Sequence, residues 1–119
     1  MAITASYCKR NGVAALTMND AAATQSIGFA DKPGEKILLV VDNQNTTTGQ
    51  TATITISKGD YLANEIGDLV VDVAKGAKSI IGPVETVRFK NTASEVDVAV
   101  AVTASGTISE VKLGVVKLP

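Results

Sequence analysis

Short segments in which apolar and polar residues alternate make up most of this chain. Residues 51–57, TATITIS, and residues 95–103, EVDVAVAVT, are the clearest of them. Alternation with a period of two places the apolar residues on one face of a β-strand. Turn-forming pairs such as Lys75-Gly76 separate such segments. This pattern predicts an all-β domain, an antiparallel β-sandwich of about seven to nine strands.

Further strands are predicted at residues 35–43, 68–76, 78–81, 84–91 and 110–119. Residues 38–41 are apolar without alternation, as in a strand that is covered on both faces. We expect the strand that contains them to pair with residues 51–57, the next predicted strand along the chain. In residues 110–119 the alternation changes phase beside Gly114, where we expect a β-bulge.

Gly82-Pro83 separates two of these predicted strands. Proline ends the first one, because its nitrogen cannot donate a hydrogen bond to a neighbouring strand. The glycine before it permits a backbone conformation that a side chain would obstruct. We expect the chain to turn a corner here and to enter the other sheet as VETVRFKN, residues 84–91, with Val87 and Phe89 pointing inward.

The first thirty residues allow more than one interpretation. Asn11-Gly12 favours a hairpin between residues 3–10 and 13–18, and a free arm is the alternative. Residues 19–26, NDAAATQS, suit either one short helical turn or an irregular crossing between sheets. Residues 1–119 are enough for one hydrophobic core and too few for two, so we expect a single domain.

Composition narrows the class of protein. Hydrophobic residues make up 45% of the chain and aromatic residues only 3%, so the core must consist mainly of Val, Ile, Leu and Ala. A net charge of −1 leaves no basic stripe for nucleic acid. The single cysteine, Cys8, excludes an intramolecular disulfide. The N-terminus lacks the pattern of a secretory signal, and no apolar stretch approaches the roughly 20 residues that cross a bilayer. We expect neither nucleic acid nor a membrane as a partner.

Residues that could carry chemistry are sparse. The chain has no histidine, and it contains neither a phosphate-binding loop nor a GxSxG motif. We therefore expect no enzyme, no cofactor and no catalytic residues. The acidic loops at residues 42–50 and 59–68 could offer oxygen ligands to calcium, but their spacing matches no EF-hand and solvated loops are commonly acidic. We predict no metal site.

Tyr61 and Leu62 are apolar residues inside a polar loop. One interpretation is that they cover one end of the sandwich. The other is that they contact a partner, since tyrosine is enriched in protein interfaces. Both interpretations stay open at this point.

Several apolar residues occupy strand positions that should face solvent. They are Leu38, Val40, Val70, Val116 and Leu118. Loops, the N-terminal hairpin or another chain must cover some of them, because contiguous exposed apolar area usually marks an interface. This surplus predicts a homo-oligomer.

Two segments resemble small proteins encoded among the head genes of tailed bacteriophages and prophages. They are GDLVVDVAKGAKSIIGPVETVRFKN, residues 67–91, and VKLGVVKLP, residues 111–119. The resemblance implies an immunoglobulin-like β-sandwich that belongs to the virion, typically a head decoration protein. It also implies synthesis in the host cytoplasm without secretion, and binding to the major capsid protein or another virion protein, which stabilises the shell.

Two alternatives to a decoration protein remain. A component of the tail or of the head–tail connector would show the same sequence features. An immunoglobulin-like adhesion module that binds carbohydrate would need aromatic residues on its loops or on one sheet face. Only Tyr7, Phe29, Tyr61 and Phe89 are available for that purpose.

Overall fold

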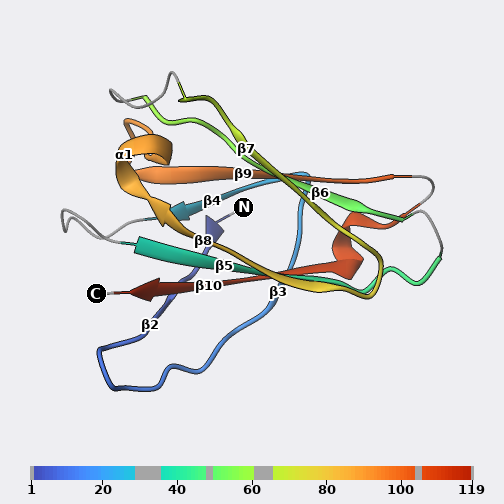
Figure 1. Ribbon diagram of the computed structural model, residues 1–119, viewed down its shortest axis with the longest axis horizontal. Coiled ribbons are helices and arrows are strands. Elements are labelled where there is room, and N and C mark those ends of the chain that lie inside the picture. The colour runs from blue at the N-terminus through green and yellow to red at the C-terminus, as the bar shows by residue number, and fades with distance from the viewer. Residues whose placement is uncertain (1, 29–35, 48–49, 61–65, 104–105, 119) are drawn as a thin grey trace.

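A computed structural model shows two β-sheets packed face to face, which confirms the predicted all-β sandwich (Figure 1). The structure describes residues 2–28, 36–47, 50–60, 66–103 and 106–118. Sheet A has the strand order β1 (Ala2–Ile3), β4 (Thr24–Gly28), β9 (Glu95–Val102), β6 (Ala52–Ile56) and β7 (Leu69–Val73). Sheet B has the order β2 (Ser6–Tyr7), β10 (Val111–Leu118), β5 (Lys36–Asn43) and β8 (Lys78–Glu85), and β3 (Asn19–Asp20) also pairs with β10.

The sheets are mixed rather than wholly antiparallel. Most pairings are antiparallel, but β1 runs parallel to β4 and β2 runs parallel to β10. Within the described residues, seven strands have five or more residues, and the three others have two residues each. The described residues thus form ten strands, slightly more than the seven to nine that were predicted. The short strands come from the first twenty residues, where the sequence carries little alternation.

Strict alternation of burial produces the core between the sheets. In β9 the buried residues are Val96, Val98 and Val100, as predicted. In sheet B, β5 alternates in the same way, whereas β10 buries the three consecutive residues Leu113, Gly114 and Val115. Their buried apolar residues are Ile37, Leu39, Val41, Val111, Leu113 and Val115. The core is therefore aliphatic, as the composition requires, and Phe89 adds a buried ring.

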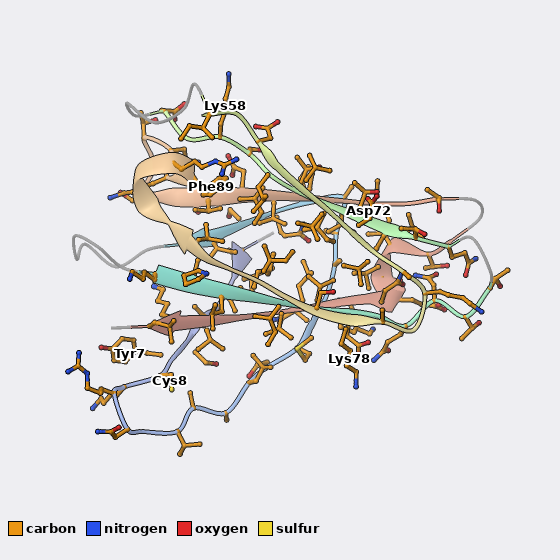
Figure 2. All side chains as sticks on the ribbon, in the orientation of Figure 1. Tyr7, Cys8, Lys58, Asp72, Lys78 and Phe89 are labelled. Atoms are coloured by element: carbon orange, nitrogen blue, oxygen red, sulfur yellow. The ribbon has the colours of Figure 1, made fainter. Side chains whose placement is uncertain are left out.

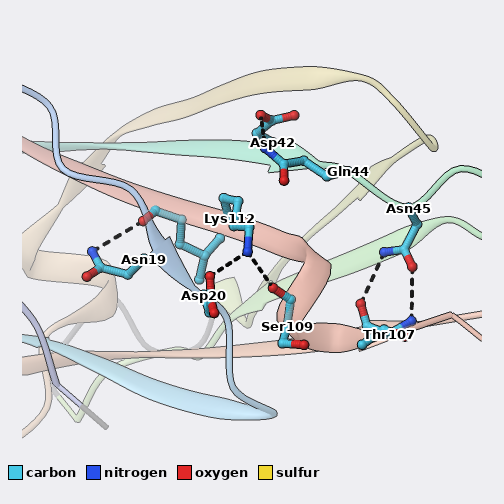
Figure 3. A network of polar contacts seen from close by, with 9 residues as sticks. Asn19, Asp20, Asp42, Gln44, Asn45, Thr107, Ser109 and Lys112 are labelled. Atoms are coloured by element: carbon cyan, nitrogen blue, oxygen red, sulfur yellow. Dashed lines mark hydrogen bonds and ion pairs between the residues drawn. The ribbon is translucent and has the colours of Figure 1, made fainter.

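The predicted pairing of the strands at 35–43 and 51–57 is wrong. β5 pairs with β8 and β10 in sheet B, whereas β6 pairs with β7 and β9 in sheet A. The connection between β5 and β6 crosses from sheet B to sheet A, and buried amide side chains stabilise it. Asn43 Nδ2 donates to the carbonyl oxygens of Gln50 and Val73, both at 3.0 Å, and Asn45 bonds to the backbone of Thr107 (Figure 3).

The predicted corner at Gly82-Pro83 is wrong as well, since β8 continues through these residues to Glu85. Gly82 and Pro83 of β8 both lie opposite Leu38 of β5, so sheet B has a β-bulge at this position. Gly82 has φ +130°, and a Cβ atom on it would lie 2.8 Å from the Ile37 carbonyl oxygen. Only glycine fits such a close approach of two backbones. No bulge occurs at Gly114, which lies within an unbroken register between β10 and β5.

The corner between the sheets lies a few residues later. Residues 86–89 form a single helical turn, α1 (Thr86–Phe89), in place of the predicted strand at 84–91. Phe89 is buried as expected, and the Arg88 guanidinium carbon lies 4.6 Å from the centre of its ring. A turn follows in which Asn91 Oδ1 accepts hydrogen bonds from two backbone amides, and the chain enters β9.

The N-terminal region forms no hairpin. The expected turn is present at Asn11, with φ 56°, but residues 13–18 form no strand. β2 and β3 both pair with β10 instead of with each other. Residues 8–18, the N-terminal loop, therefore project from the β10 side of sheet B (Figure 1). Of the two interpretations of residues 19–26, the irregular crossing between sheets is correct.

Candidate interaction surface

The outer side of sheet B carries a band of apolar side chains across three adjacent strands. In β5 the outward residues are Leu38 and Val40, because the residues between them are buried. Val40 lies beside Ile80 of β8 on one side, and Leu38 lies beside Val116 of β10 on the other. With the residues of the N-terminal loop that lie on it, this band is called the outer apolar face. Its members are Leu16, Met18, Leu38, Val40, Ile80, Val116 and Leu118.

The outer apolar face is accessible to solvent. Ile80 is 69% exposed, Leu16 is 43% exposed, and the four residues of β5 and β10 are half-buried. The prediction that residues 38–41 are covered on both faces is therefore wrong, since only the inner face of β5 is fully covered. The outward positions predicted for the apolar residues of β5 and β10 are confirmed. Contiguous exposed apolar area of this kind is typical of a contact surface.

The N-terminal loop lies along the β10 side of this face (Figure 1). A Cβ atom on Gly114 would lie 2.7 Å from Met18 Sδ and 2.8 Å from Leu16 Cδ1, so both side chains rest on this glycine. The Ser6 hydroxyl donates to the Ala15 carbonyl oxygen at 2.8 Å and ties the loop to β2. The loop thus covers part of the face, as the surplus of outward apolar residues suggested, and leaves the rest open.

Charged residues lie at the ends of the same three strands. At one end the register places Asp42 between Lys78 and Lys112. Lys112 forms an ion pair with Asp20 of β3 and donates to the Ser109 carbonyl oxygen at 2.9 Å (Figure 3). An apolar centre with a polar rim is the usual composition of a protein interface.

The outer side of sheet A has a different chemistry. Its outward residues are mainly Ser, Thr and Ala, and its carboxylates are Asp68, Asp72, Glu95 and Asp97. A shallow hollow of about 440 Å³ lies over β4 and β9, lined mostly by hydroxyl and carboxylate groups. Hydrogen bonds engage both of its carboxylates. Glu95 accepts from Ser26 Oγ at 3.1 Å, and Asp97 accepts from Asn91 Nδ2 at 3.1 Å.

In the acidic loops considered as cation sites, side-chain oxygens accept hydrogen bonds from N–H groups of the protein. Asn43 Oδ1 accepts hydrogen bonds from Asn45, at 3.1 Å from the backbone nitrogen and 2.9 Å from Nδ2. Asp60 accepts from the Thr92 amide at 2.9 Å, and Asp68 accepts from the Lys58 amide at 2.7 Å. Among the described residues, no group of three or more His, Cys, Asp or Glu side chains could hold a metal ion.

Tyr61 and Leu62, the predicted partner contacts, lie outside the described residues, and their role stays a prediction. Sequence inspection missed Ile80 and the loop residues Leu16 and Met18. The available signal was the pair Ile80-Ile81, since two consecutive apolar residues in a strand place one on each face.

Comparisons with protein-family models, with curated proteins and with solved structures each find no match for this chain. The likeness to phage head proteins and the immunoglobulin-like connectivity therefore stay predictions. Within the described part of the chain, no helix is long and apolar enough to cross a membrane.

Proposed function

We propose that this chain is a non-enzymatic structural protein of a tailed-bacteriophage virion. Its role is that of a head decoration protein, which binds the capsid shell through the outer apolar face. The observation that carries the proposal is the accessible apolar band across β10, β5 and β8. Contiguous apolar surface on a small domain is costly in water unless a partner covers it. The resemblance of residues 67–91 and 111–119 to phage head proteins supplies the class of partner, the major capsid protein.

A sheet face suits this role because its side chains are already in place. Backbone pairing fixes the register of Leu38, Val40 and Val116, so docking orders few additional groups and loses little conformational entropy. A protein that binds the assembled shell and not its free subunits stabilises the shell by mass action. Decoration therefore requires only a rigid contact surface and preferential affinity for the assembled state.

Other virion surfaces could take the same face, and the particle that is bound decides among them. A component of the tail or of the head–tail connector would bind tails or connectors in place of heads. An adhesion module for carbohydrate has less support. Of the two aromatic residues that the structure describes, Phe89 is buried and Tyr7 is 44% exposed at one edge of sheet B.

Association into a homo-oligomer remains a prediction of its own. Decoration at a local symmetry axis would favour a closed oligomer, because closed symmetry limits growth. Light scattering of the purified protein over a range of concentrations measures this, and a monomer at the highest concentration would contradict it.

Co-sedimentation tests the proposed function. The purified protein is mixed with assembled heads, and separately with tails, from the phage or prophage whose genome carries this gene. We expect it to pellet with heads, to saturate at a fixed ratio to the capsid subunit, and to raise the temperature at which the heads release their DNA. Binding to tails alone would assign it to the tail, and binding to neither particle would refute a virion role.

A further inference from the structure

The described strands at the borders of the two sheets differ in how well they are protected from further pairing. β1, β2 and β3 have two residues each, and β8 is interrupted by its bulge at Gly82-Pro83, where proline offers no N–H group. Short strands, bulges and prolines are common devices that keep a sheet border from pairing with another chain. β7, at the border of sheet A, has none of them, and its five residues pair with β6 in an unbroken register.

The backbone groups on the open side of β7 belong to Val70 and Asp72. Ser57, the residue after β6, donates to the Asp97 carbonyl oxygen of β9 at 3.0 Å, so the odd-numbered residues of β6 bond to β9. The even-numbered residues of β6 therefore bond to β7, where their partners are the odd-numbered residues. The N–H and C=O groups of Val70 and Asp72 thus point away from β6. Among the described residues, no hydrogen bond engages these outward groups, which we call the open edge of β7.

Contacts at both ends limit the open edge to the middle of the strand. The Asp68 carbonyl oxygen accepts a hydrogen bond from the Arg88 guanidinium at 3.4 Å. The Ala74 carbonyl oxygen accepts one from the Ala77 amide at 3.0 Å, within the turn toward β8. Only a short stretch of backbone is therefore available for pairing.

The side chains of this stretch also suit a neighbouring strand. On the outer side Val70 is 58% exposed. Asp72 projects from β7 (Figure 2), and its carboxylate accepts a hydrogen bond from Thr53 Oγ1 at 2.8 Å, which turns it toward β6. On the inner side Leu69 and Val71 pack against the core and are only half-buried. A strand added here would cover apolar surface on both sides of the sheet.

We infer that the open edge of β7 pairs with β7 of a second copy, antiparallel about a two-fold axis at Val71. Val70 then lies opposite Asp72 of the second copy, and the two residues exchange both of their N–H···O bonds, so every group of the open edge gains a partner. On the inner side Val71 meets its own counterpart and Leu69 meets Val73 of the second copy. The apolar core thus continues from one sandwich into the next, and the two-fold symmetry closes the assembly as a dimer.

Charge selects this register among those that two-fold symmetry allows. An axis at Val70 would place Asp68 opposite Asp72 of the second copy, and an axis at Asp72 would place the two Asp72 residues opposite each other. Like charges directly opposite each other on paired strands are unfavourable. A slip of one residue would turn the apolar inner side of one copy to the outer side of the other. β7 therefore matches its own sequence in one register, which favours a second copy over an extended segment of another protein.

Opposite charges at position 70 test this pairing. In the dimer residue 70 lies beside Asp72 of the second copy, so Val70→Lys introduces an attraction and Val70→Asp a repulsion, each repeated by symmetry. A contact this small is weak, so sedimentation equilibrium measures its dissociation constant at protein concentrations up to about 1 mM. We expect the constant of Val70→Asp to exceed that of Val70→Lys about tenfold, and the difference to shrink in about 0.5 M salt.

Matched controls carry the same charges away from the edge. Ala101 is an exposed outward residue of β9, the central strand of sheet A. Ala101→Lys and Ala101→Asp should have dissociation constants within about twofold of each other, because position 101 lies outside the proposed contact. Circular dichroism checks that all four variants are folded.

Two results would overturn the inference. A wild type that stays monomeric at the highest concentration would show that β7 does not pair. Equal dissociation constants for the two variants at position 70 would place the dimer contact elsewhere, and dissociation by Ile80→Asp would then assign it to the outer apolar face. Co-sedimentation with heads decides the proposed function separately, because the outer apolar face lies on sheet B and each copy keeps its own.

Discussion

The two outer faces of this sandwich differ, although the inner faces beneath them are alike. Both sheets bury alternating Val, Ile and Leu against each other. Outward, sheet A presents mainly Thr53, Thr55 and carboxylates, with Val70 as an exposed apolar residue beside Thr55. Sheet B presents Leu38, Val40 and Ile80 at equivalent positions. The fold requires only the inner faces, so the apolar residues outside sheet B call for another explanation.

This difference separates what stabilises the fold from what serves contact. Inward residues determine folding, since they leave water when the sheets pack. Outward apolar residues gain less on folding, because they stay partly exposed in the monomer, most of all Ile80. They gain only when a second surface covers them. Because the outer faces differ in this way, we propose that a partner docks on sheet B.

The largest expected effect concerns the shared core. Phe89→Ala removes a buried ring and leaves a cavity, so it should lower the free energy of unfolding by about 3–5 kcal/mol. Tyr7→Ala removes a ring that is 44% exposed and should cost less than about 1 kcal/mol. Urea denaturation of both variants measures the contrast, and equal losses would mean that the inside and the outside are wrongly assigned.

The next effect distinguishes the two outer faces directly. Ile80→Asp places a charge in the outer apolar face, and Val70→Asp makes a similar change at an exposed position of sheet A. Both should fold with stability within about 0.5 kcal/mol of the wild type, because both sites are on the surface. Affinity for heads should fall about 30-fold for Ile80→Asp only, the loss typical of a contact at the centre of an interface. Similar losses of affinity for heads in both variants would contradict the proposed difference between the two faces.

The smallest effect concerns the N-terminal loop, which has no counterpart on sheet A. Gly114→Ala adds a methyl group where Leu16 and Met18 rest, so it should push the loop off β10 at a cost of about 1 kcal/mol. Trypsin should then cleave faster after Lys9 and Arg10. Gly28→Ala on β4 is the control, since no atom lies within 4 Å of the added carbon, and it should leave the cleavage rate unchanged. An unchanged cleavage rate in Gly114→Ala would show that packing on Gly114 does not hold the N-terminal loop in place.

Much of this fold follows from local alternation. The wrong predictions concern features that depend on residues far apart in the sequence. The inward sides of β6 and β9 were predictable, because the period of two is visible within each segment. The partner of β5 was not, because buried amides such as Asn43 and Asn45 turn the following segment into a crossing. Gly82-Pro83 marked an irregularity correctly, but whether a strand bends or bulges there depends on the strand opposite.

The candidate surface was predictable only in part. The outward positions of Leu38, Val40, Val116 and Leu118 follow from parity along each strand. That Ile80 lies beside them depends on the register between β5 and β8, and the sequence of one strand alone does not determine that register. The seating of Leu16 and Met18 on Gly114 joins residues about one hundred positions apart and left no trace in the local pattern.

Side-chain footprinting by hydroxyl radicals tests the central claim most directly, because it reports which face is covered in the complex. The oxidation of individual residues is compared between the free protein and the protein bound to heads. We expect binding to protect Ile80, Val40 and Met18, and to leave Val70 on sheet A as reactive as before. Protection of Val70 with undiminished oxidation of Ile80 would place the contact on the opposite sheet and contradict this account.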